Sequence, residues 1–199
     1  MRPKPSPLTD RGGRRFRRRR VPRREGFGLL EVMVSLSVLT IALLAFSQAI
    51  LMSLTAGQVQ REQGIARDAA RQMIERMQAE TFSEVFARYN ATAVDDPAAG
   101  NVFAASFVVT GLKLQAGDVD GMVGEILFPT APDALGGLML REDLDDDRFG
   151  TPRDLNADGV VDALDHSGDY QLLPVAVRLR WRGRAGNASL EFKTYLADI

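Results

Sequence analysis

The 199-residue chain contains no cysteine, one histidine and one tryptophan. Without cysteine it forms no disulfide bond, no thiolate metal site and no thiol nucleophile, although its redox compartment stays undecided. It also lacks a Ser/His/Asp arrangement, a glycine-rich phosphate loop and the spacing of zinc ligands. Its carboxylates cluster and do not form a separated acid and base pair, so we predict that the protein is not an enzyme. The single histidine, His166, lies in a polar loop and is predicted to be solvated.

Charge is strongly segregated along the chain, although the net charge is only −1. Residues 1–26 hold eleven basic side chains against Asp10 and Glu25, which leaves a local charge of +9. The other residues hold 14 basic and 24 acidic side chains, a local charge of −10. A basic head before an acidic body is typical of a membrane-topology signal, so no nucleic-acid partner is expected. Binding of nucleic acid or acidic lipid by the arginines at 17–20 stays open as an alternative.

A long apolar run occupies residues 32–54, and no charged residue occurs between Glu31 and Arg61. This length is enough to cross a bilayer as a helix, which takes about 20 residues. The positive-inside rule then places the arginines in the cytoplasm and the acidic body on the other side. A secretory signal peptide is the rival interpretation, but its apolar region is only about 7–15 residues and ends at a small-residue cleavage site. Glu31 needs an explanation, because inserting a carboxylate into a membrane costs roughly 2.5–3.5 kcal/mol.

A specific motif precedes the apolar run: Gly26-Phe27-Gly28-Leu29-Leu30-Glu31-Val32. It resembles the type III signal of type IV pilins and type II secretion pseudopilins, and its continuation is most similar to minor pilins and minor pseudopilins. The resemblance implies that a prepilin peptidase cuts after Gly26 and methylates the new N-terminal Phe27. It also implies a role for Glu31 in assembly. Gly28 and the long leader depart from the usual family pattern.

Pairing between subunits explains the position of Glu31. Cleavage would free a positive amine on Phe27, four residues away. The carboxylate of one subunit is expected to pair with the amine of a neighbour, and surrounding lipid or protein would strengthen their attraction. Each charge must also be desolvated, so the pair specifies register more than it adds stability. The alternative is that Glu31 is an interfacial residue of an ordinary signal-anchor.

We expect three regions along the chain. Residues 1–26 form a basic cytoplasmic leader that is removed on maturation, and residues 27–55 form a transmembrane and assembly helix. Residues 56–199 form a globular head that includes the C-terminal half of the helix. Apolar residues recur every four positions from Ile65 to Met77, which predicts an amphipathic helix that continues to about Tyr89.

Strand patterns fill the rest of the head. Runs at Val102–Leu114, Val123–Phe128 and Leu138–Arg141 precede a hairpin formed by Leu173–Trp181 and Ser189–Leu196. Apolar residues alternate with arginines in the first arm of this hairpin. The arginine face is expected to be solvated, with contact to an acidic neighbouring subunit as the alternative. The predicted fold class is α+β: a long N-terminal helix packed on a small antiparallel β-sheet head, as in pilins.

A second motif spans residues 154–165 and reads D-x-N-x-D-G-x-x-D-x-x-D. It resembles the calcium loop of dockerins and EF-hands, and calcium prefers six to eight hard oxygen ligands. The predicted ligands of a Ca²⁺ ion are the side chains of Asp154, Asn156, Asp158, Asp162 and Asp165 and the backbone carbonyl of Val160. EF-hands prefer Glu at the last position and have a preceding helix, so we expect a stabilising loop and not a sensor. The acidic run at 142–147 is predicted to be solvated, although it could add ligands.

The resemblance implies a structural subunit: a minor pilin or pseudopilin of a type IV pilus or a type II secretion filament. Its partners would be the prepilin peptidase, other pilin or pseudopilin subunits and the bacterial inner membrane. It would cross that membrane once, with an extracytoplasmic head. One alternative is a minor pilin of a DNA-uptake system, against which the acidic body argues. Another is a membrane-anchored extracytoplasmic calcium-binding domain that does not assemble.

Overall fold

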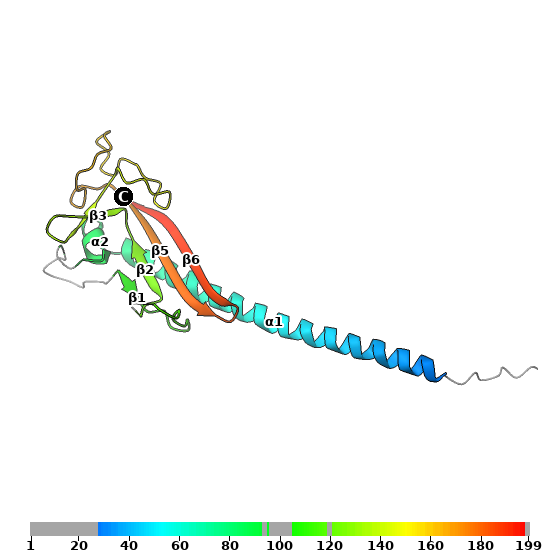
Figure 1. Ribbon diagram of the computed structural model, residues 1–199. Helices are drawn as coiled ribbons and strands as arrows, with labels where there is room; N and C mark the ends of the chain where they lie inside the picture. The colour runs from blue at the N-terminus through cyan, green and yellow to red at the C-terminus, as the bar shows by residue number, and fades with distance from the viewer. Residues whose placement is uncertain (1–27, 93–94, 96–104, 119–120, 198–199) are drawn as a thin grey trace, which may run out of the picture. The chain divides into compact units, whose positions relative to one another are not determined.

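A computed structural model describes residues 28–92, 95, 105–118 and 121–197 (Figure 1). The predicted leader at 1–26 and both predicted processing residues, Gly26 and Phe27, lie outside the described residues. The chain forms two compact units, Met1–Ser47 and Gln48–Ile199. The boundary between them falls within the first helix.

The first helix, α1, spans Leu29–Gln78 and continues through Gly57 and Gly64. Among the described residues, it is the one helix long and apolar enough to cross a membrane. Its large apolar side chains before residue 55 are exposed. The hydroxyls of Ser37, Thr40 and Ser47 each donate to the carbonyl four residues earlier, at 2.8–2.9 Å. These polar interruptions are therefore already hydrogen-bonded inside the helix, which suits them to an environment without water.

The head contains two antiparallel sheets. The larger has the strand order β1-β2-β5-β6, and the smaller pairs β3 with β4 (Figure 1). The strands are β1 (Ser106–Phe107), β2 (Gly124–Leu127), β3 (Thr130–Pro132), β4 (Leu138–Leu140), β5 (Leu172–Gly183) and β6 (Gly186–Ala197). The predicted hairpin corresponds to β5 and β6, whose register pairs Leu172 with Ala197 and Gly183 with Gly186.

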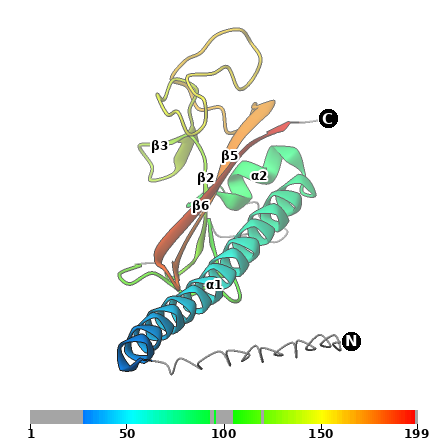
Figure 2. The same cartoon turned by 90° about the vertical axis from the view of Figure 1, so that its right-hand side faces the viewer.

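The core lies between the large sheet and the part of α1 beyond Gln48, which run side by side (Figure 2). Ala66, Ala70 and Met77 of α1 are buried, as the fourfold apolar spacing indicated. Facing them are the buried apolar residues of β5: Val175, Val177, Leu179 and Trp181. The predicted α+β fold, a long N-terminal helix packed on a small antiparallel sheet, is confirmed.

The helix does not continue unbroken to Tyr89. α1 ends at Gln78, and a separate helix, α2, spans Phe82–Tyr89. The last turn of α1 tightens, because the amide of Glu80 bonds to the carbonyl of Met77 at 3.2 Å. The backbone is then extended at Thr81. Because of this break, the apolar face of α2 packs into the core. Helical periodicity alone does not predict this burial.

The predicted strand at 102–114 is also mostly wrong. Only Ser106–Phe107 pair with β2, and residues 102–104 lie outside the described part of the chain. Gly111 has a φ of 94°, and the amide of Leu112 bonds back to the carbonyl of Val109 at 3.3 Å. A turn therefore ends the extended segment, because a left-handed glycine redirects the chain.

Candidate functional site

Glu31 lies in the first turn of α1 and is exposed. Its amide bonds to the carbonyl of Gly28 at 2.9 Å, and the amide of Val32 bonds to the same carbonyl at 3.2 Å. Gly28, an unexpected residue for the motif, therefore begins the helix. The carboxylate sits near the positive end of the helix dipole, which favours a negative charge. The helix presents this charge outward, where a second chain can reach it.

The loop at 154–165 is organised by its own short polar side chains. Asp154 accepts from the amide of Ala157 at 2.6 Å through Oδ1 and from the amide of Gly159 at 2.8 Å through Oδ2. Asn156 Oδ1 accepts from the amide of Asp158 at 3.1 Å. Ala157 and Gly159 have left-handed φ angles of 62° and 88°. Two such residues close together wind the backbone tightly around Asp154.

The last predicted ligand is engaged elsewhere. Asp165 Oδ1 accepts from the amides of Leu140 and Ser167 at 3.0 and 3.1 Å, and Oδ2 accepts from the Ser167 hydroxyl at 2.9 Å. Asp165 thus fastens the loop to the end of β4. Of the other predicted ligands, Val160 contributes an amide that bonds to Asp158 Oδ1 at 2.8 Å, and Asp162 Oδ1 accepts from the amide of Leu164 at 2.7 Å.

The prediction that Glu142 is solvated is wrong, because its side chain is fully buried. Its Oε1 accepts from the amides of Leu155 and Asn156 at 2.5 and 3.2 Å. Its Oε2 is buried and has no hydrogen-bond partner within the described residues. The nearby Asp143 does remain exposed, paired with Arg141 at 2.5 Å. Glu142 of the acidic run therefore binds the backbone at the start of the loop and fixes its first turn.

His166 is also buried, at 3 % exposure, so its predicted solvation is wrong. Its Nδ1 lies 3.2 Å from Asp169 Oδ1, and its Nε2 lies 3.3 Å from Asp162 Oδ1 and 3.6 Å from Glu142 Oε2. Burial alone lowers the pKa of His166, but the hydrogen bond to Asp162 and the charges of Glu142 and Asp169 together raise it. The charged imidazolium is thus favoured at this position. It neutralises part of the acidic loop.

Within the described part of the chain, no three His, Asp or Glu side chains are arranged to hold a metal ion. The loop carboxylates bond mainly to loop amides, so the side chains do not converge on one point. The donor chemistry nevertheless fits calcium, because every predicted ligand atom is a hard oxygen. Glu142 Oε2 is a further oxygen of this kind, and it faces His166 Nε2 at 3.6 Å.

Sequence reasoning missed Glu142 and Asp169 as partners of the loop. A local signal for Glu142 existed: Leu138, Leu140 and Glu142 alternate along an extended segment, and Leu140 is buried. Residues two apart in a strand share a face, so this alternation places Glu142 toward the core. No comparable signal identifies Asp169, which contacts the loop through Asn156 Nδ2 at 3.1 Å.

Comparison with known proteins gives one match. Residues 22–47 match the family described as the prokaryotic N-terminal methylation motif, and no curated protein and no solved structure matches the chain. The matched residues include Gly26, Phe27 and Glu31 and extend into α1. The chain therefore carries a type IV pilin-like N-terminal methylation signal, which supports a structural subunit of pilin or pseudopilin type.

Proposed function

We propose that the protein is a minor pilin or minor pseudopilin of a type IV pilus or type II secretion filament. The peptidase would cut after Gly26 and methylate Phe27, and the head would lie on the extracytoplasmic side of a bacterial inner membrane. The match at 22–47 carries this proposal, because it joins a processing motif to a helix able to span a membrane. The α+β head is consistent with it.

Glu31 would guide assembly. Its carboxylate is exposed in the first turn of α1, so the Phe27 amine of a neighbouring subunit can approach it. In lipid or at a protein interface, an unpaired carboxylate is costly, and pairing removes part of that cost. A subunit would therefore enter the filament at the position where its Glu31 meets an amine.

Two variants test this role in cells that express the peptidase. Glu31→Gln keeps the shape of the side chain and removes its charge, whereas Glu75→Gln does the same at an exposed position late in α1. We expect Glu31→Gln to reach the membrane in normal amounts but to disappear from sheared filaments, and Glu75→Gln to assemble. Mass spectrometry of the mature N-terminal peptide should show methylated Phe27 in both. Normal incorporation of Glu31→Gln would show that assembly does not need this charge, whereas absence of the wild-type chain itself from filaments would favour a simple signal-anchor.

We also propose that the loop at 154–165 binds calcium in a structural role. Asp154, Asn156, Asp158 and Asp162 would supply side-chain oxygens and Val160 its carbonyl, as the spacing predicts. Asp165 is already bonded to Leu140 and Ser167. Glu142 Oε2 would close the site only with His166 Nε2, 3.6 Å away, neutral or displaced. A divalent cation would supply the positive charge that so many carboxylates in one loop need.

Chelation tests the calcium proposal. We expect EDTA to lower the melting temperature of the detergent-solubilised full chain and added Ca²⁺ to restore it, since a ligand at 100 times its Kd stabilises by about 2.7 kcal/mol. Asp158→Asn keeps the acceptor for the Val160 amide but removes a ligand charge, so it should melt like the chelated wild type. Asp145→Asn, at an exposed position outside the loop, should still respond to Ca²⁺. If EDTA leaves the melting temperature of the wild type unchanged, the proposal is contradicted.

A further inference from the structure

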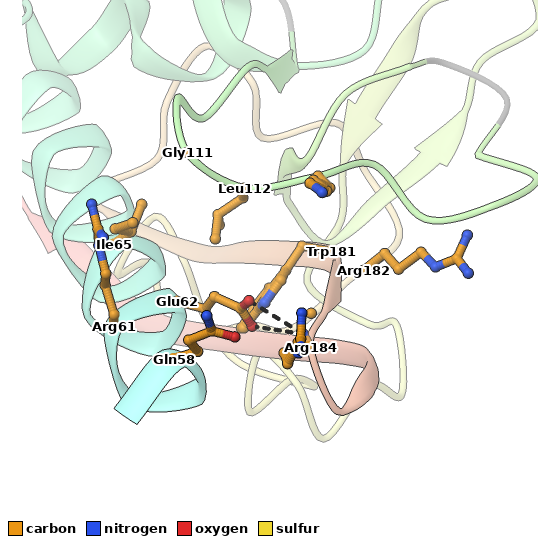
Figure 3. A pocket seen from close by; sticks show the side chains of 11 residues that line it. Gln58, Arg61, Glu62, Ile65, Gly111, Leu112, Trp181, Arg182 and Arg184 are labelled. Atoms are coloured by element: carbon orange, nitrogen blue, oxygen red, sulfur yellow. Dashed lines mark hydrogen bonds between the residues drawn. The ribbon is translucent and has the colours of Figure 1, made fainter. Parts of the chain in front are cut away.

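A pocket of about 710 Å³ lies between α1, the loop at 111–113 and the turn that joins β5 to β6 (Figure 3). Four cationic side chains line it: Arg61, Lys113, Arg182 and Arg184. None of the four takes part in an ion pair within the described residues, and all are exposed. Glu62 also lines the pocket, so four cations against one carboxylate leave a local excess of positive charge for an anion.

The neighbouring arginines of β5 differ in this respect. Arg178 and Arg180 pair with Glu125 of β2 at 2.7 and 3.6 Å. The predicted arginine face is thus divided: the single carboxylate of Glu125 partly neutralises its middle, whereas no ion pair within the described residues reaches its end at the hairpin turn. The uncompensated charge is concentrated beside α1.

The wall of the pocket is held in place by a specific contact. Glu62 on α1 accepts from the backbone amide of Arg184 at 3.2 and 3.3 Å, which fixes the hairpin turn to the helix (Figure 3). Behind it, Trp181 is buried, and its Nε1 has no hydrogen-bond partner within the described residues. The site is therefore preformed, with a rigid aromatic wall.

The pocket begins just beyond the apolar run. Leu54, its last large apolar residue, is exposed and precedes Gln58, the first residue of the pocket, by one turn of α1. Arg61 lies about 10 Å further along the helix axis than Leu54, at 1.5 Å per residue. The headgroup layer on each side of a bilayer is about 5–8 Å thick. Because long basic side chains extend several ångströms toward such a layer, the pocket is at headgroup level when the apolar run is in the membrane.

We propose that this pocket binds the headgroup of an anionic phospholipid while the subunit resides in the membrane. The phosphate and its negative charge match the cations. The inference rests on the membrane anchoring in the proposed function, but not on calcium binding or filament assembly. Position favours lipid over an acidic protein segment, because the cations directly follow the apolar run of the same helix.

Trp181 is the only tryptophan in the chain, so its fluorescence reports on the pocket. The full chain is placed in phosphatidylcholine nanodiscs that contain rising fractions of phosphatidylglycerol. We expect a saturable change in emission. Arg182→Gln/Arg184→Gln should raise the midpoint roughly tenfold to thirtyfold, since each basic group near the surface contributes on the order of fivefold. Arg67→Gln/Arg71→Gln, an equal charge change at exposed positions further along α1, should leave the midpoint unchanged.

Other outcomes overturn the proposal. An equal response in both double variants, or no dependence on phosphatidylglycerol, means that the pocket does not select anionic lipid. Soluble glycerophosphate that reproduces the change at equal concentration points to a free phosphate site. A peptide of residues 142–169 that does so in pure phosphatidylcholine points to an acidic protein partner. A chain that carbonate extracts from membranes contradicts the anchoring itself, whereas an inserted chain without a lipid response contradicts only the headgroup pocket.

Discussion

At the scale of single residues, the sequence predicts local polar contacts better than burial. The bonds of Asp154 and Asp158 run to amides two to five residues ahead, so spacing alone predicts them. The contacts of Glu142 reach residues 13 and 14 positions later. Alternation along the segment places Glu142 toward the core, but the amides that it meets depend on how β4 and the loop pack together. The burial of His166 depends on the same packing.

Glu142 should therefore matter more for stability than its exposed neighbour. Glu142→Ala leaves two buried amides without their acceptor and removes an anion beside His166, so we expect a loss of about 3 kcal/mol in the free energy of unfolding. Asp143→Ala, which removes an exposed ion pair, should cost less than about 1 kcal/mol. Denaturant titration of the two variants measures the difference, and equal losses would show that burial does not set the role of Glu142.

Tyr170 should make the protein sensitive to alkali. Its hydroxyl donates to the Phe82 carbonyl at 2.5 Å and accepts from the Phe86 amide at 3.3 Å. Burial raises the pKa of Tyr170 to about 12, whereas an unfolded tyrosine has a pKa of about 10. The folded state therefore holds this proton more tightly, and stability falls as the pH rises from about 10 to 12.

Tyr170→Phe removes that titration together with two hydrogen bonds. We expect it to cost about 1–2 kcal/mol at neutral pH and to flatten the alkaline loss of stability. The loss should not vanish, because burial also raises the pKa of Tyr89 to about 12. Melting temperatures between pH 8 and pH 11 provide the measurement. An unchanged slope in the variant would exclude Tyr170 as a titrating group.

At the scale of elements, long periodic segments are predictable and short ones are not. Apolar residues alternate along β5 and β6 and recur every four positions on α1. Each pattern extends over many residues, and the contacts of those residues all favour the same structure. β3 has three residues and β1 has two, too few to show a period. Their pairing depends on tertiary contacts, which for β1 include the packing of Phe107 on Gly124 of β2.

Gly124 is central to that packing. A Cβ at this position would overlap the ring of Phe107, its pairing partner on β1. We expect Gly124→Ala to displace the ring and to destabilise the head by about 1–3 kcal/mol, as overpacking does. Gly168→Ala is the control, because nothing lies within 4 Å of its added Cβ. Hydrogen exchange should show the loss of protection at β1, and protection equal to wild type would contradict the role of Gly124.

At the scale of the whole molecule, the hydrophobic core and the exposed apolar run occupy different parts of one helix. Every residue of the core cluster lies at or beyond Ile65. The exposed apolar side chains of α1 lie before residue 55. Charge segregation and the apolar run predict this division, because each extends over tens of residues.

A chain that begins at Ala56 should therefore fold. It keeps the whole core cluster and loses only the apolar run. We expect a soluble protein that melts cooperatively, within about 5 °C of the full chain in detergent, and that no longer sediments with membranes. Circular dichroism and flotation measure these properties. A molten or insoluble fragment would show that the first half of α1 is needed for folding the head.

The hydroxyl bonds inside α1 have a consequence for how such a subunit leaves the bilayer. Ser37, Thr40 and Ser47 carry their acceptors with them, so none must find a new partner when lipid is exchanged for protein. Glu31 is the one charged group on the segment up to Arg61. When lipid around this segment is exchanged for protein, Glu31 is therefore the group that most needs a complementary charge.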